Sequence, residues 1–79
     1  MVDIEPIRSF IRQKFLFDDN APLADDQELY PSIFDSLGVL ELVAFVEKTY
    51  SVNIEDDELL VTNFQSLAAI AALLESKQG

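Results

Sequence analysis

The stretch Ile33-Phe34-Asp35-Ser36-Leu37-Gly38-Val39-Leu40-Glu41-Leu42-Val43 begins the most amphipathic helix that the sequence predicts. Asp35 and Ser36 are both favourable helix N-caps, and no proline interrupts the run from Leu37 to Tyr50. A serine here lies at the surface, beside backbone N–H groups that helix geometry leaves without partners. A phosphate esterified to it would meet the positive end of the helix dipole. Ser36 is therefore a candidate modification site; the simpler alternative is that it only caps the helix.

Ser36 is the only serine that combines a preceding acid, a following leucine and the start of an amphipathic helix. Ser66 comes nearest, but it lacks the acid, and an ordinary N-cap role accounts for it. The motif Asp35-Ser36-Leu37, followed in the helix by Glu41-Leu42-Val43, resembles the attachment motif of acyl and peptidyl carrier proteins. The resemblance runs from about Ile4 to about Leu74, so it covers most of the chain.

This resemblance implies a specific chemistry for the motif. In carrier proteins the serine bears a 4'-phosphopantetheine arm taken from coenzyme A, whose thiol holds an acyl or aminoacyl group as a thioester. Ser36 is accordingly the expected attachment site, and Asp35 is expected to help a phosphopantetheinyl transferase position magnesium and coenzyme A. The other implied partners are an acyl- or aminoacyl-activating enzyme and downstream acyl-transfer enzymes. The implied function is a non-enzymatic carrier that shuttles its cargo between them.

Two residues depart from the family pattern. Phe34 stands where a small residue often precedes the aspartate, and Gly38 stands where fatty-acid carriers commonly have a polar or acidic residue. Glycine at this position weakens the first helical turn by about 1 kcal/mol relative to alanine. The run from Gly38 to Val43 resembles stand-alone carriers of secondary metabolism or aminoacyl transfer more than the fatty-acid carrier. The cargo, the pathway and the burial of the cargo stay open.

Length and charge restrict the function further. The 79 residues predict a single domain, residues 1–79, with no linker to another one, and thus a discrete carrier. Fifteen acidic residues against five basic ones give a net charge of −10, and three of the basic residues, Arg8, Arg12 and Lys14, precede residue 15. Most of the surface is expected to repel nucleic acid and anionic membranes and to attract basic protein surfaces. The alternative is that the acids only keep the chain soluble.

The chain contains neither cysteine nor histidine. Disulfides, thiolate nucleophiles, the usual zinc sites and a near-neutral acid–base group are therefore excluded, so we expect neither catalysis nor a metal site. A thioester carrier of this sequence must borrow its thiol. No apolar stretch is long enough to span a membrane, and the N-terminus lacks the layout of a signal peptide. We expect a cytoplasmic monomer.

Hydrophobic periodicity predicts an all-α fold. We expect a small antiparallel bundle of three long helices plus one short helix, in which Arg8 and Arg12 lie on a solvated face. The expected helices cover Asp3 to about Phe17, Leu37 to Tyr50, the short segment Asp56 to Val61, and a last helix capped by Ser66, with a long loop from Asp18 to Phe34.

The second helix is predicted to present a docking surface. Its spacing points Val39, Leu42, Val43, Val46 and Tyr50 inward. Leu37 and Leu40 then face outward next to Ser36 and would be apolar anchors for partner enzymes, or else they only flank the core. The acids expected to meet basic residues of partners are Glu41, Glu47, Asp56 and Asp57. The competing hypothesis for the whole chain is an unmodified acidic helical protein-interaction module.

Overall fold

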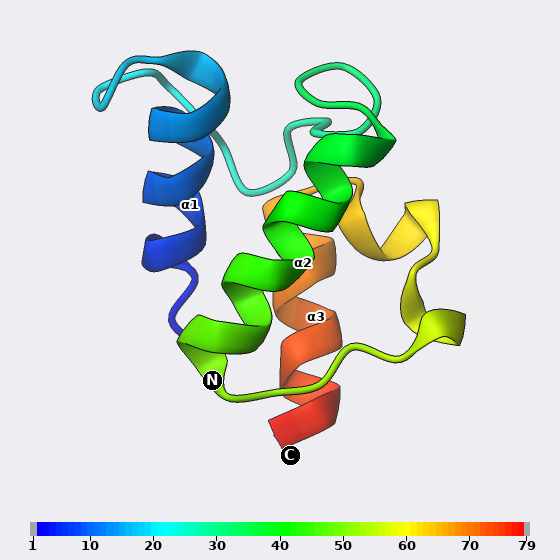
Figure 1. Cartoon of the computed structure of the whole chain (residues 1–79). Coiled ribbons are helices and arrows are strands. Elements are labelled where there is room, and N and C mark those ends of the chain that lie inside the picture. Colours follow the sequence, from blue (N-terminus) through cyan, green and yellow to red (C-terminus); the bar gives the residue numbers. More distant parts are fainter. Residues whose placement is uncertain (1, 79) are drawn as a thin grey trace.

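The computed structural model of the chain describes residues 2–78 and shows a helical fold (Figure 1). No strand occurs among these residues, which confirms the all-α expectation. In chain order the elements are α1 (Glu5–Ile11), the π-helical segment η1 (Arg12–Leu16), α2 (Ser36–Tyr50), the 3-10 turns η2 (Asp56–Glu58) and η3 (Val61–Phe64), and α3 (Leu67–Gln78).

The three α-helices do not all alternate in direction. In Figure 1, α1 rises from the N-terminal end, whereas α2 and α3 both descend. The expected antiparallel relation therefore applies to α1 against the other two helices and not to α2 against α3. The reason lies in the connector, residues 51–66, which is long enough to carry the chain back towards the end of the molecule where α2 begins.

The core lies where the three helices meet. Of the residues of α2 predicted to point inward, Leu42, Val43 and Val46 are buried, whereas Val39 and Tyr50 are only half-buried; Ile7 and Ile11 of α1 are buried as well. Each fully buried aliphatic side chain of this kind contributes about 1.5–3 kcal/mol. The buried hydrophobic residues as a whole are Ile7, Ile11, Leu23, Leu29, Phe34, Leu42, Val43, Val46, Ile54, Phe64, Leu67, Ile70 and Leu74.

The first helical region runs from Glu5 to Leu16, slightly shorter than the predicted range of Asp3 to about Phe17, and its last turn is a π-helix. Regular α-helix ends at Ile11, the wider η1 turn follows, and the helix terminates at Phe17 in the left-handed region with a φ of 55°. Within η1, the ring of Phe15 lies 4.9 Å from the ring of Phe34. The end of this helical region is thus packed against the residues that lead into α2.

Two arginines of the first helical region hold the long loop between this region and α2, rather than lying on a solvated face as expected. Arg8 is only 14% exposed, and its guanidinium donates to the carbonyl of Leu23 and to the carboxylate of Asp25. Arg12 Nε donates to the carbonyl of Ala21 at 2.8 Å. The hydrogen bond that Arg8 donates to Asp25 raises the pKa of Arg8 above its usual value. The expectation was wrong because these bonds depend on the path of a loop that has no regular pattern.

The same loop is also bonded to the start of α3. The carbonyl of Asp25 accepts from the N–H of Ala68 at 2.9 Å, and the N–H of Leu29 donates to the carbonyl of Gln65 at 2.6 Å. Leu29 is fully buried. Long loops in small domains are usually functional or fixed by their own side chains. This one is fixed on both sides, so it delivers the chain to the start of α2 in a defined position.

The connector after α2 does not contain the short helix expected over residues 56–61. Glu55 and Glu58 form a reciprocal capping box, with the N–H of Glu55 donating to Glu58 Oε1 at 2.8 Å. Lys77 Nζ, on α3, also lies 2.6 Å from Glu58 Oε1. The backbone then leaves the helical region at Leu59, and η3 begins two residues later. Residues 59–61 are all exposed, so no buried apolar stripe is available to stabilise a continuous helix through them.

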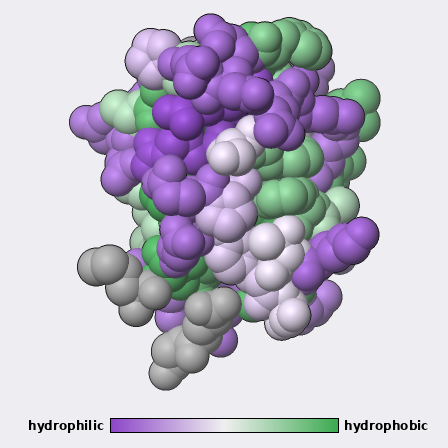
Figure 2. Space-filling view, turned by 90° about the vertical axis from the view of Figure 1, so that its left-hand side faces the viewer, coloured by the Kyte–Doolittle hydropathy of each residue, from purple (hydrophilic) through white to green (hydrophobic). Residues whose placement is uncertain are grey.

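The side of the molecule that carries α1 is mainly polar. Figure 2 shows hydrophilic residues over the upper and central part of this side, with a band of hydrophobic residues towards its right-hand edge. This agrees with the amphipathic pattern of α1, in which buried Ile7 and Ile11 alternate with exposed residues such as Ser9.

Candidate functional site

Asp35 and Ser36 occupy the first positions of α2. Asp35 has an extended backbone, with φ −97° and ψ −167°, and its Oδ1 accepts from the N–H of Gly38 at 3.1 Å. Asp35 is therefore the N-cap, and Ser36 is the first helical residue. Ser36 is exposed. Its hydroxyl lies at the surface, as modification by another protein would require.

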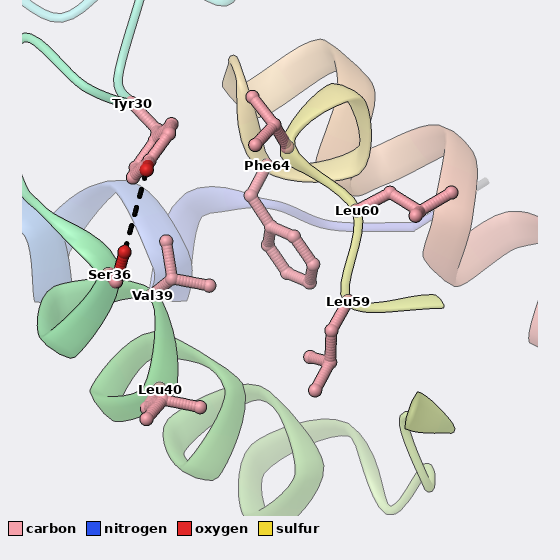
Figure 3. Close-up of a pocket in the computed structure, with 8 residues that line it drawn as sticks. Tyr30, Ser36, Val39, Leu40, Leu59, Leu60 and Phe64 are labelled. Carbon is pink, nitrogen blue, oxygen red and sulfur yellow. Dashed lines mark hydrogen bonds between the residues drawn. The ribbon is translucent and has the colours of Figure 1, made fainter. Parts of the chain in front are cut away.

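Tyr30 lies over this serine. The Oη of Tyr30 and the Oγ of Ser36 are 3.5 Å apart (Figure 3), which is longer than an ordinary O–H···O bond of about 2.7–2.8 Å. The contact is therefore weak. The backbone next to Tyr30 is nevertheless held, because the preceding residue, Leu29, is fully buried and its carbonyl accepts from the N–H groups of Ile33 and Phe34.

A cleft of about 220 Å³ opens beside Ser36 (Figure 3). One wall belongs to the first turns of α2, and the other belongs to the connector before α3. Apart from the Tyr30 phenol, its lining carries no ionisable side chain: it consists of Tyr30, Ser36, Val39, Leu40, Leu59, Leu60, Val61 and Phe64. An apolar group attached near Ser36 would find apolar surface within reach.

A second hollow flanks the other side of the same helix. The roughly 100° rotation between successive helical residues places Leu37, Gly38 and Glu41 opposite the cleft. Two carboxylates line this hollow, in contrast to the cleft. Its lining residues are Phe15, Pro31, Ile33, Phe34, Asp35, Leu37, Gly38 and Glu41.

The two departures from the family pattern touch each other. Gly38 is buried, and a Cβ placed on it would lie 2.6 Å from Cβ of Phe34 and 3.1 Å from Cε1 of Phe15. Such distances are too short for an unstrained contact. Glycine at position 38 therefore allows Phe34 to pack under the start of α2, and the two unusual residues form a complementary pair.

The expected apolar anchors face solvent. Leu37 is 64% exposed and Leu40 is 56% exposed. Leu40 borders the cleft, whereas Leu37 borders the second hollow. The outward orientation predicted for both residues is thus observed, and the two leucines lie on either side of Ser36.

The four predicted acidic contacts have different surroundings. Glu41 Oε2 lies 3.2 Å from Lys14 Nζ, and Glu47 Oε2 accepts from the N–H of Ile54 at 2.8 Å. Both carboxylates therefore already have partners within the chain. Asp56 and Asp57 are exposed on η2, which directly precedes the cleft residue Leu59.

Comparison with protein families identifies the class of this chain. The model of the family described as phosphopantetheine attachment site matches residues 8–74, and the chain therefore belongs to this family. Its members carry covalently attached 4'-phosphopantetheine. Carrier domains of this kind generally hold acyl groups without catalysing reactions, and they work with phosphopantetheinyl transferases and acyl-handling enzymes. Comparison with curated proteins finds no match.

The residues at the start of α2 fit such a group. Ser36 offers an exposed hydroxyl for the ester bond, and the apolar cleft lies directly beside it.

Across residues 2–78 no helix is both long and apolar enough to cross a bilayer. Within the same range no cluster of three or more acidic side chains could hold a metal ion.

Sequence reasoning missed most of the cleft. The pattern assigned no functional role to Tyr30, Leu59, Leu60 or Phe64. A usable signal was present in the apolar run from Leu59 to Val61, because some residues of such a run must be exposed in a short element. Nothing local in the sequence indicates the approach of Tyr30 to Ser36.

Proposed function

We propose that this chain is a carrier domain that holds an acyl or aminoacyl group as a thioester on an arm attached to Ser36. The observation that carries the proposal is the exposed hydroxyl of Ser36 on the first turn of α2, inside the segment that matches the family and beside the cleft. The alternative, an unmodified acidic interaction module, gives no role to this arrangement.

The chemistry divides between the chain and the arm. The bound arm supplies the thiol that a chain without cysteine lacks. Ser36 Oγ is the acceptor oxygen: it forms the phosphodiester bond as the pyrophosphate bond of coenzyme A breaks, adenosine 3',5'-bisphosphate leaves, and the hydroxyl proton passes to a base of the transferase. Asp35 caps α2 through Gly38 and so holds Ser36 at the surface. The resemblance adds that the carboxylate of Asp35 helps the transferase position magnesium.

Partner enzymes dock around Ser36. Leu37 and Leu40 provide exposed apolar anchors, and Asp56 and Asp57 provide exposed carboxylates for basic residues of the partner. The remaining predicted acids, Glu41 and Glu47, contribute at the edges of this surface, because their internal bonds restrict them. Docking through exposed charges is fast, weak and sensitive to salt, which suits a carrier that must be released.

Intact mass tests the proposal directly. Wild-type protein incubated with coenzyme A, magnesium and a broad-specificity phosphopantetheinyl transferase is expected to gain the mass of one arm. Ser36→Ala is expected to gain nothing and to keep its helical circular dichroism. The matched control is Ser66→Ala, since Ser66 likewise stands at the start of a helix, where its Oγ accepts from the N–H of Ala69 at 3.1 Å. A folded wild type that gains no mass would contradict the carrier function.

Several finer expectations stay predictions. They are that residues 1–79 act as one carrier domain, that the domain is a cytoplasmic monomer, and that the cargo is of the secondary-metabolite or aminoacyl kind. Loading of the modified protein in a mixture of acyl and aminoacyl substrates would identify the cargo.

A further inference from the structure

The surface around Ser36 is electrically asymmetric. The second hollow is lined by the carboxylates of Asp35 and Glu41. The basic residue near it, Lys14, is already paired with Glu41 at 3.2 Å. An anionic group on Ser36 would be repelled on that side, because like charges at short range disfavour one another.

The cleft on the other side of α2 offers the opposite environment. It has no carboxylate, and its polar groups include the hydroxyls of Ser36 and Tyr30. A phenol can donate a hydrogen bond, and bonds from neutral donors to anionic oxygens are shorter and stronger than neutral ones. The 3.5 Å gap between Tyr30 Oη and Ser36 Oγ shows that the phenol is close to the serine without being tightly bonded to it.

Tyr30 is also held in place before any group is attached. The N–H of Leu29 is bonded to Gln65, and the carbonyl of Leu29 closes the following turn by accepting from Ile33. Pro31 further limits the backbone on the other side of Tyr30. The backbone at Tyr30 is therefore held, and its half-buried ring packs against the core, so keeping the hydroxyl near an arm on Ser36 would require little additional ordering.

We infer that Tyr30 is a positioning residue for the arm: its hydroxyl donates to a phosphodiester oxygen on Ser36 and directs the arm over the cleft side of α2, towards Leu59 and Leu60. This inference rests on the proposed function. It also gives a physical reason for the fixed loop, since the bonds from Arg8 and Arg12 to the loop help to keep Tyr30 above Ser36.

The two tyrosines of the chain provide a matched comparison. Tyr50 Oη donates to the carbonyl of Asp3 at 2.6 Å, and Tyr50 is the last residue of α2, at the opposite end of the helix from Ser36. Tyr30→Phe and Tyr50→Phe each remove one hydroxyl and keep the ring. Each variant and the wild type are first modified with coenzyme A, and the gain of mass is verified. Circular dichroism verifies that each variant is folded.

The readouts are the ³¹P resonance of the phosphodiester and the position of the arm. A spin label on the arm thiol is expected to broaden the amide signals of Leu59 and Leu60 more than those of Leu37 and Glu41. Tyr30→Phe is expected to shift the ³¹P resonance. It is also expected to lower the ratio of arms on the cleft side to arms on the opposite side by about fivefold, which corresponds to about 1 kcal/mol for one hydrogen bond. Tyr50→Phe is expected to match the wild type in both.

The outcomes separate the two proposals. Absence of the mass gain in the folded wild type would refute the carrier function itself. A normal mass gain with the same ³¹P resonance and the same broadening in Tyr30→Phe and in the wild type would overturn the role of Tyr30 alone. Equal effects in Tyr30→Phe and Tyr50→Phe would also overturn it, because they would indicate a general loss of stability.

Discussion

Gly38→Ala is expected to destabilise the protein, although helix propensity alone predicts the reverse. Alanine in a helix is about 1 kcal/mol more favourable than glycine. At Gly38, however, the added Cβ would lie 2.6 Å from Cβ of Phe34 and 3.1 Å from Phe15. Overpacking of this kind costs about 1–3 kcal/mol. The net effect is a loss of about 0–2 kcal/mol, centred near 1.

Urea denaturation followed by circular dichroism measures this change. The matched control is Ala44→Gly, the reverse exchange at an exposed position of α2, which should cost about 1 kcal/mol through propensity alone. A Phe34→Gly background removes the Cβ and the ring that would meet the added methyl group, so the penalty of Gly38→Ala should shrink there and the double-mutant cycle should show coupling. A gain of about 1 kcal/mol for Gly38→Ala in the wild-type background would refute the reasoning.

Three further predictions follow from single contacts. The hydrogen bond that Lys77 donates lowers the pKa of Glu58 below its usual 4.5. The stabilisation from this pair is therefore present above pH 4.5 and is lost as the pH falls through the lower pKa that Glu58 has in the folded state. Glu58→Gln should flatten this loss in acid unfolding curves. Arg8→Met should speed amide exchange at Leu29, because Arg8 holds the loop that leads to Leu29 through its bond to the carbonyl of Leu23. Unchanged exchange at Leu29 would contradict the role of Arg8 in fixing the loop. Leu40→Ala should weaken docking of the transferase by about 1 kcal/mol or more with little loss of stability, whereas Ala72→Ser, at an exposed position of α3, should leave docking unaltered.

The parts of the fold that follow from local pattern were predictable. The run after Ser36 has helical spacing and ends at Tyr50, and Ser66 precedes the last apolar stripe, so α2 and the start of α3 could be located from the sequence. The outward faces of Leu37 and Leu40 followed from the same spacing. These features depend on residues that are neighbours in the sequence, where periodicity carries the information.

The parts that depend on distant contacts were not predictable. The pairing of Arg8 with Asp25 requires the path of the loop, and the π-helical turn that contains Phe15 is packed against residues before α2. The break at Leu59 follows a capping box that is also bonded to Lys77 on α3. For the site, motif and spacing predicted Ser36 as the attachment residue, but the approach of Tyr30 depends on how Leu29 is buried. Hydrophobic periodicity contains no record of such contacts.

The most direct test of the account is to locate the arm within the modified protein. The protein is treated with coenzyme A and transferase and then digested, and tandem mass spectrometry is used to read which serine carries the added mass. The account predicts a single modified residue, Ser36, and no modification of Ser32 or Ser66. An arm found on any other serine, or a folded protein that acquires none, would contradict the assignment of Ser36 as the functional centre of this chain.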